Sequence, residues 1–234
     1  MAKQVRAIRT RQTILEAAAQ VFEKQGYQAA TITDILKVAG VTKGALYFHF
    51  QSKEELAMGV FDAQEPPQRV PPQDLKLQEL VDVGVLFIHR MRTSLLARAG
   101  VRLSMDQQAH SLDRRGPFLR WRESTLELLA AAKEHGELLP HVNPAESADL
   151  YVGAFAGVQA VSQIMSNYED LDRRYAALQK HVLPSIAVPS VLAALDFSPD
   201  RAARLALESS PPEPGSEARY AQRTADLARP ASVG

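Results

Sequence analysis

Apolar residues recur at spacings of three and four along most of this chain, which is the pattern of amphipathic α-helices. The first such segment covers residues 9–25, and Gly26 directly after it favours a helix end. Five residues form its apolar face: Ile14, Ala17, Ala18, Val21 and Phe22. The sequence therefore predicts that the chain opens with a helix that buries one side.

Hydroxyl side chains at the ends of the apolar segments predict where the next helices begin. Thr31 and Asp34 have the spacing of a capping box, and they predict a short helix over residues 32–39. Thr42 is placed to cap a third helix of about seven residues, and Ser52 to cap a fourth. Two short helices after a longer one form the arrangement of a helix-turn-helix.

Four prolines between residues 66 and 72 form the clearest break in this pattern. Longer helices are predicted after the break at about 75–92, 95–107, 117–135, 144–167 and 170–183, with a short one after Pro189. Pro184 is expected to end the helix before it. From about residue 198 the periodicity fades and prolines become frequent, which predicts a mostly flexible tail, in which RAARLALE could form one or two weak helical turns.

The predicted fold class is therefore all-α. We divide the chain into a helix-turn-helix head at 1–56, which includes the start of the connecting helix, a larger helical body at 57–197, and a flexible tail at 198–234. The body is long enough to bury an apolar core of its own.

Charge is distributed unevenly although the formal net charge is zero. Residues 1–50 hold seven Lys or Arg and three Asp or Glu, a balance of +4, and the rest of the chain must then carry −4. A basic head on an acidic body fits a local contact with nucleic acid.

The sequence also limits the class of protein. It contains no cysteine, so it forms neither a disulfide framework nor a thiolate metal site. Its basic N-terminus is not followed by an apolar segment typical of a signal peptide, and no apolar stretch approaches the length of a membrane span. We therefore expect a cytoplasmic protein without a membrane partner.

The third predicted helix has two different faces. At 100° per residue, its inner face includes Ala45 and Leu46. Its outer face includes Lys43, Gly44, Tyr47 and Phe48. A lysine can bind phosphate or a guanine edge, a glycine permits close approach of the backbone, and an aromatic ring can contact a thymine methyl. The alternative is that the two rings belong to an apolar core, as aromatic stripes usually do.

Further candidates for DNA contact lie around this helix. Arg6, Arg9, Arg11 and Lys53 could hold phosphates without reading sequence. Thr33 and Thr42 are expected to act mainly as caps, although Thr42 can also touch phosphate. His49 lies near the helix end, where a phosphate contact and a packing role are equally compatible with the sequence.

The segment TITDILKVAGVTKGALYFHFQSKEEL, residues 31–56, resembles the DNA-binding signature of TetR-family transcriptional regulators. More narrowly, AIRTRQTIL, RAGVRLS, GPF followed by a tryptophan, and GELLPHV resemble the γ-butyrolactone autoregulator receptors of Streptomyces-type bacteria. The resemblance implies a homodimer built through a four-helix bundle, which binds a pseudo-palindromic operator on double-stranded DNA. It also implies a repressor of antibiotic-production and differentiation genes that a diffusible lactone releases from DNA.

The resemblance further implies that Trp121 lines the effector pocket. Other pocket candidates come from helical periodicity: Gln64, Leu86, Phe87, Phe155, Val158, Gln159 and Ser162. They combine apolar walls with a few groups that can form hydrogen bonds to a lactone. For each of them, a role in packing alone remains the alternative.

Three competing interpretations remain. A regulator of the same fold could respond to another small molecule, such as a butenolide, an antibiotic or an efflux substrate. A helical enzyme is disfavoured because the sequence shows no metal-ligand spacing, no cofactor motif and no nucleophile signature. A protein that merely coats DNA would lack the large apolar body.

Overall fold

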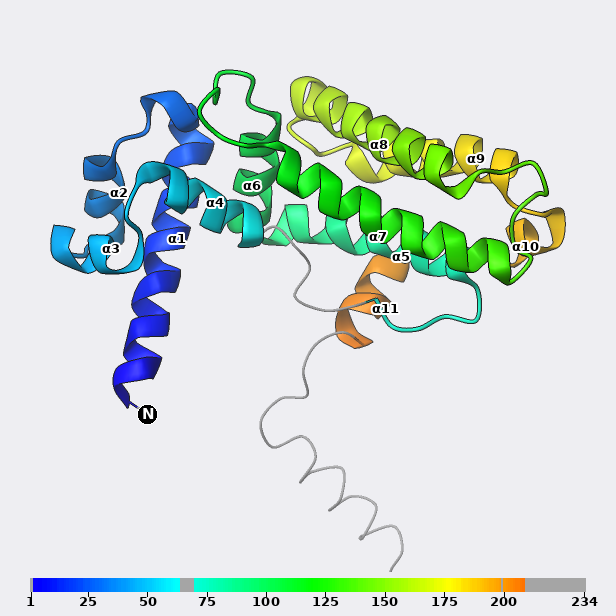
Figure 1. Ribbon diagram of the computed structural model, residues 1–234, viewed down its shortest axis with the longest axis horizontal. Coiled ribbons are helices and arrows are strands. Elements are labelled where there is room, and N and C mark those ends of the chain that lie inside the picture. Colours follow the sequence, from blue (N-terminus) through cyan, green and yellow to red (C-terminus); the bar gives the residue numbers. More distant parts are fainter. Residues whose placement is uncertain (1, 64–69, 199, 209–234) are drawn as a thin grey trace, which may run out of the picture.

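The computed structural model describes residues 2–63, 70–198 and 200–208. The head contains α1 (Ala2–Ala29), α2 (Ile32–Ala39), α3 (Lys43–His49) and α4 (Lys53–Ala63) (Figure 1). The remaining helices are α5 (Lys76–Thr93), α6 (Leu95–Met105), α7 (Arg115–Glu134), α8 (Pro144–Ser166), α9 (Leu171–Ile186), α10 (Pro189–Ala194) and α11 (Arg201–Glu208). The predicted all-α class is confirmed. Across these ranges, no helix has the length and apolar character needed to cross a membrane.

The predicted caps of the head helices are present. The Thr31 hydroxyl accepts from the Asp34 backbone N–H at 3.1 Å, and the Asp34 carboxylate accepts from the Thr31 N–H at 3.3 Å. Thr42 accepts from the Ala45 N–H at 3.2 Å and begins α3. Gly40, between α2 and α3, has φ 63°, a conformation that a glycine adopts without strain. These local contacts set the angle between the two short helices.

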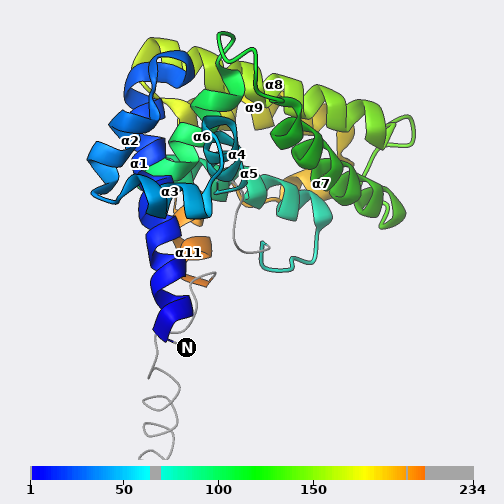
Figure 2. The ribbon, with the colours of Figure 1, turned by 60° about the vertical axis from the view of Figure 1, so that its left-hand side comes forward.

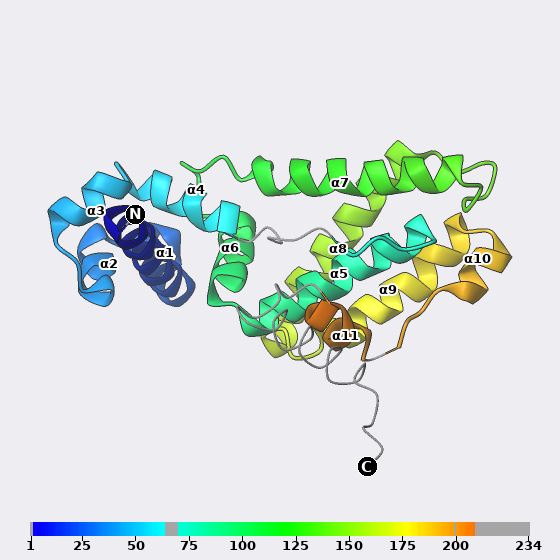
Figure 3. The ribbon, with the colours of Figure 1, turned by 90° about the horizontal axis from the view of Figure 1, so that it is seen from below.

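Helix α6 lies between the head and the long helices, as Figures 1 and 3 both show. Ala99 and Leu103 on one face of α6 belong to the apolar core formed by α1 to α4. Val101, on the other face, belongs to the core formed by α5 and α7 to α9. The N-terminal part of α1 projects beyond this packed region (Figure 2). A single short helix is thus buried on two sides and joins the two cores.

Helix α9 passes through Pro184 and ends at Ile186, so the prediction that Pro184 ends it is wrong. Pro184 occupies the last turn, where it removes only one backbone hydrogen bond. The helix then closes with a 2.8 Å bond from the Ala187 N–H to the Leu183 carbonyl. Proline is tolerated here because the helix ends two residues later, at Ile186.

The C-terminal segment is more ordered than its composition predicts. Residues 201–208 form α11, which packs against α5, and this corrects the expectation of a flexible tail from residue 198 onwards. The part of the predicted tail at 209–234 lies outside the described residues. Leu205 is buried at 2% exposure and supplies the apolar contact of α11.

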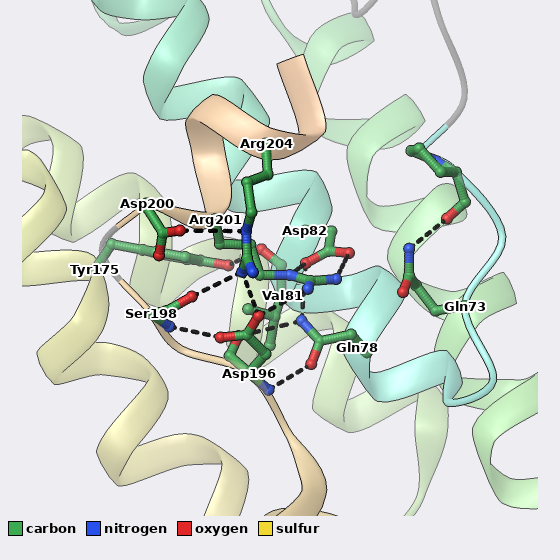
Figure 4. Close-up of polar contacts among 11 residues, drawn as sticks. Gln73, Gln78, Val81, Asp82, Tyr175, Asp196, Ser198, Asp200, Arg201 and Arg204 are labelled. Carbon is green, nitrogen blue, oxygen red and sulfur yellow. Dashed lines mark hydrogen bonds and ion pairs between the residues drawn. The ribbon is translucent and has the colours of Figure 1, made fainter. Parts of the chain in front are cut away.

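An ion pair that is almost fully buried holds α11 on α5 (Figure 4). The Arg201 guanidinium donates two 2.5 Å hydrogen bonds to the carboxylate of Asp82, whose side chain is 0% exposed. Gln78 donates to the same carboxylate at 2.8 Å, and Asp196 accepts from Arg201 at 2.9 Å. Hydrogen bonds to Asp82 raise the pKa of Arg201. The charge on Asp82 is thus compensated only while α11 remains in place.

We expect Arg201→Ala to lower the free energy of unfolding by about 3–5 kcal/mol, because it leaves Asp82 buried without a counter-charge. Urea unfolding followed by circular dichroism measures the change. A second substitution, Asp82→Asn, removes the uncompensated charge and should recover part of the loss.

The matched control is Arg115→Ala. Arg115 also pairs with an aspartate, Asp113, but both side chains are exposed to solvent, so we expect no resolvable change in the unfolding midpoint. Equal effects of the two arginine substitutions would contradict a structural role for the buried pair.

Candidate nucleic-acid interface and effector core

The two faces of α3 separate as the sequence predicts. Leu46 is 0% exposed and packs in the head, whereas Tyr47 is 36% and Phe48 77% exposed. Lys43 and Gly44 are also exposed. A Cβ at Gly44 would meet no protein atom within 4 Å, so the head itself does not require glycine there. An exposed phenylalanine beside a residue without a side chain favours close approach by a flat partner.

The arginines predicted to flank α3 are exposed on α1. Arg6, Arg9 and Arg11 are all exposed, and the Arg11 guanidinium lies 4.9 Å from the centre of the Phe50 ring. Arg11 thus sits close to the end of α3. Arg11 is thus the predicted arginine that the structure places next to α3.

One of the predicted polar contacts has a different geometry. Thr33 is exposed in the first turn of α2 and does not cap it, because Thr31 occupies the cap position. Thr42 caps α3, as expected. His49 is half-buried, and its ring lies edge-on to that of the exposed Phe48 at 5.0 Å, so both roles predicted for it stay open.

Lys53 faces inward rather than towards a DNA partner. Its ammonium group donates to the carbonyls of Tyr27 at 3.0 Å, Ala30 at 3.1 Å and Gln28 at 3.4 Å. It also lies 4.4 Å from the centre of the Tyr27 ring. An ammonium has three donors, and all three are used here. The prediction of a phosphate clamp at Lys53 is therefore corrected: this residue caps the C-terminal end of α1 and joins it to α4.

Three of the predicted pocket residues form one aromatic cluster in the body. Trp121 of α7 stacks on Phe87 of α5 with ring centres 5.3 Å apart. The Trp121 ring also meets the edge of Phe155, on α8, at 4.7 Å. Val158 is half-buried against the same core. Three helices that are distant in sequence thus bring these predicted pocket residues into mutual contact.

The remaining pocket candidates have other surroundings. Leu86 is half-buried on α5, and Gln159 is buried with its amide nitrogen 4.0 Å from the Met91 sulfur. The Ser162 hydroxyl donates to Asp170 at 2.7 Å, so it stabilises the turn between α8 and α9 rather than offering its proton to a ligand. Gln64 lies outside the described residues.

A surface hollow of about 390 Å³ lies between α6 and the start of α7. It is lined by Ser104, Leu112, Asp113, Arg114, Arg115 and Phe118. Phe118 precedes Trp121 by one helical turn. The hollow and the aromatic cluster thus both include residues of α7.

A buried polar group, which sequence reasoning missed, adjoins the aromatic cluster. The hydroxyls of Tyr151 and Tyr175 lie 2.9 Å apart, and the Gln179 amide donates to Tyr151 at 2.7 Å. Burial raises the pKa of Tyr151 to about 12, so the phenol is neutral at physiological pH. One feature of the sequence could have indicated this group. Tyr151 and Phe155, and likewise Tyr175 and Gln179, are four residues apart, which places each pair on one helix face.

Several contacts connect the body to the head close to α6. The Arg98 guanidinium pairs with Glu23 at 3.2 Å, and the Asp106 carboxylate accepts from the Tyr27 N–H at 3.4 Å. Gln28 donates to the Gln108 carbonyl at 2.7 Å. The end of α1 is thus held by α6 and by the loop that follows it.

Helix α8 also carries an exposed apolar surface. Its exposed large residues are Leu150 at 65%, Val161 at 45%, Ile164 at 82% and Met165 at 69%. Gly153 and Gly157 are exposed between them, where a neighbouring helix could approach closely. An apolar surface of this kind on a helix marks a contact with another protein chain.

Comparison with known proteins identifies relatives of both regions. Residues 14–58 match the family model of bacterial regulatory proteins of the tetR family. The chain is 42% identical to the A-factor receptor protein of Streptomyces griseus over 193 residues, which cover 82% of this chain and 69% of that protein.

Solved structures extend the similarity over both cores. The full-length native TylP, a TetR regulator from Streptomyces fradiae, superposes with a TM-score of 0.81 at 42% identity, covering 88% of this chain and 100% of that one. A γ-butyrolactone receptor described as ArpA-like superposes with a TM-score of 0.64 at 27% identity, covering 87% and 99%.

We expect Lys53→Met to lower the free energy of unfolding by about 1.5–3 kcal/mol, the range for hydrogen bonds to a charged group. The matched control is Lys43→Met, which changes an exposed lysine on α3 and should alter stability by no more than about 0.5 kcal/mol. Chemical unfolding of the two variants decides whether Lys53 stabilises the head or is free to contact phosphate. If Lys53→Met is as stable as the unaltered protein, Lys53 does not hold the end of α1, and a phosphate contact becomes the better interpretation of this residue.

We expect Ile164→Asp to raise the dissociation constant of the homodimer by more than about tenfold, because it places a charge in the apolar surface of α8. Sedimentation equilibrium measures the constant. Leu119→Asp, at a residue of α7 that is 59% exposed, is the control and should leave assembly unchanged. A dimer that tolerates Ile164→Asp would place the interface elsewhere.

Proposed function

Because the chain belongs to the TetR family of bacterial regulatory proteins, it is a ligand-responsive repressor that binds operator DNA as a dimer, and we propose that its effector is a γ-butyrolactone. The observation that carries this proposal is the aromatic cluster of Phe87, Trp121 and Phe155. An indole supplies a flat wall for a small ring, and the neighbouring apolar side chains suit an alkyl chain.

The names of the relatives support the same effector class. The A-factor receptor protein is similar over most of this chain, and the structural relative with a 0.64 TM-score is called a γ-butyrolactone receptor. We also propose target genes in antibiotic production and differentiation, as the sequence resemblance implies. We expect the protein to act in the cytoplasm and to catalyse no reaction.

In the proposed DNA complex, the outer face of α3 enters the major groove. Lys43 and Tyr47 contact phosphates or base edges, Gly44 permits close approach, and the ring of Phe48 packs on thymine methyl groups. A two-fold dimer presents two such helices about 34–36 Å apart, one turn of DNA, or a multiple of that spacing. The operator should therefore be a pseudo-palindrome.

We propose that the effector acts through α6. A ligand beside Trp121 separates α7 from α5 and α8, and α6 is buried between that core and the head. A shift of α6 moves α1 through its contacts with Glu23 and Tyr27, which changes the spacing of the two α3 helices. The ligand needs only a higher affinity for the state in which the heads are out of register.

We expect a saturating γ-butyrolactone to weaken operator binding by about 5- to 150-fold, the usual range of coupling between two sites. The measurement is a gel shift with a pseudo-palindromic duplex obtained by selection from random sequences. Because Trp121 is the only tryptophan, its fluorescence reports lactone binding separately. Unchanged DNA binding at saturation would eliminate release by lactone, and a butenolide or antibiotic that does cause release would replace it.

Two variants separate the sites within the same assay. Lys43→Ala should lose DNA affinity and retain lactone binding. Trp121→Ala should retain DNA binding and lose the response, with Trp121→Phe as a milder change if packing suffers. The opposite pattern would overturn both assignments.

A further inference from the structure

The side-chain carbonyl oxygen of Gln179 in the body core has no hydrogen-bond donor among the residues that the structure describes. Gln179 is 1% exposed, and its Nε2 atom donates to the Tyr151 hydroxyl at 2.7 Å. A buried acceptor without a partner is costly, and such groups are uncommon in folded proteins. An unused acceptor next to an aromatic cluster is therefore a candidate contact for a ligand.

The count of protons decides which atom of the amide is unpaired. When Tyr175 donates to the Val81 carbonyl at 3.1 Å, Tyr151 donates in the 2.9 Å contact between the two tyrosines and accepts from the Gln179 amide nitrogen at 2.7 Å. With the amide reversed, Tyr175 would have to donate to Tyr151 instead, and its hydrogen bond to Val81 would be lost. The orientation that forms more hydrogen bonds therefore places the amide nitrogen towards Tyr151. The unpaired atom is therefore the oxygen, and the missing partner is a donor.

The unpaired oxygen lies close to the proposed effector wall. Phe155 and Tyr151 are one turn apart on α8, and Tyr175 and Gln179 are one turn apart on α9. The rings of Phe155 and Tyr175 meet edge to face at 5.1 Å, so the two pairs are side by side. The distance from the ring of Phe155 to the level of Gln179 is therefore about one helical pitch, roughly 5.4 Å. A flexible chain of a few bonds spans it.

The glycine at position 84 indicates that the polar group is closely fitted. A Cβ there would come within 2.1 Å of the Tyr175 hydroxyl, so any larger residue would displace it. The fixed position of Tyr175 fixes Tyr151, and Tyr151 fixes the amide of Gln179. The free oxygen is consequently held in one orientation before a ligand arrives.

We infer that Gln179 determines effector specificity: its carbonyl oxygen accepts a hydrogen bond from a hydroxyl on the flexible part of the effector. This inference rests on the proposed function, because it assumes that the ring of the effector binds at Trp121. A ketone at the same carbon offers only an acceptor, and two acceptors facing each other leave both unpaired. The site therefore selects an alcohol over the corresponding ketone.

The test uses two synthetic 2-alkyl-γ-butyrolactones that differ only in a hydroxyl or a ketone on the alkyl carbon next to the ring. We expect the full-length protein to bind the alcohol about tenfold more tightly than the ketone, as measured by Trp121 fluorescence and by release of operator DNA. In Gln179→Met, which keeps the length of the side chain but removes the acceptor, this ratio should fall to about one while the ketone binds as before.

A matched control is Tyr168→Phe. Within the described part of the chain, the Tyr168 hydroxyl is also buried without a hydrogen-bond partner, but it lies at the turn after α8, away from the aromatic cluster. Its removal should therefore leave the tenfold ratio intact. A ratio near one in the unaltered protein, or a ratio that survives in Gln179→Met, would overturn the inference.

The same alcohol and ketone pair on a butenolide ring distinguishes failure of the inference from failure of the proposed function. If only the butenolides bind, the lactone proposal is wrong, and their alcohol-to-ketone ratio still tests Gln179. If neither ring class binds, the effector site at Trp121 and the role of Gln179 are both overturned.

Discussion

The burial of α6 on two faces is the contact on which the rest of this structure depends. Leu103 packs among the helices of the head, and Val101 packs in the core that contains Trp121. Close-packed interiors transmit displacement because they contain little free volume. A helix shared by two cores cannot move in one without moving in the other. The regulator therefore requires no hinge of its own between effector and DNA; the shared packing provides the connection.

Buried polar groups fall into two kinds, and the difference indicates their roles. Lys53 is satisfied by three backbone carbonyls, and Asp82 is satisfied by Arg201 and Gln78. Each of these groups holds a helix end or a terminal helix in place, and each would be costly to expose or to leave unpaired. The Gln179 oxygen differs because its surroundings order it without satisfying it. Complete pairing stabilises the fold, whereas incomplete pairing in an ordered site leaves an interaction for a ligand.

The sequence predicted what depends on neighbours within one or two turns. The caps at Thr31 and Thr42 and the two faces of α3 follow from local spacing, and the structure agrees with them. Prediction from the sequence failed where a side chain contacts a partner that is distant along the chain. Lys53 reaches carbonyls more than 20 positions earlier, and Arg201 reaches Asp82 across 119 positions. The composition around α11 predicted flexibility. It could not reveal the ion pair with the Asp82 carboxylate, which lies far away in the sequence and holds α11 in place.

Two exposed apolar regions show that the single chain is an incomplete unit. The α8 surface around Ile164 is broad and faces away from the core, and a second copy buries such a surface by two-fold symmetry. Phe48 is exposed beside Tyr47 and Lys43 on α3, which suits a charged and flat partner rather than another protein core. The dimer contact at α8 fixes the distance between the two copies of Phe48. In the mechanism that we propose, a displacement of α6 by the effector changes that distance, and the fixed spacing of the operator makes even a small change unfavourable for binding.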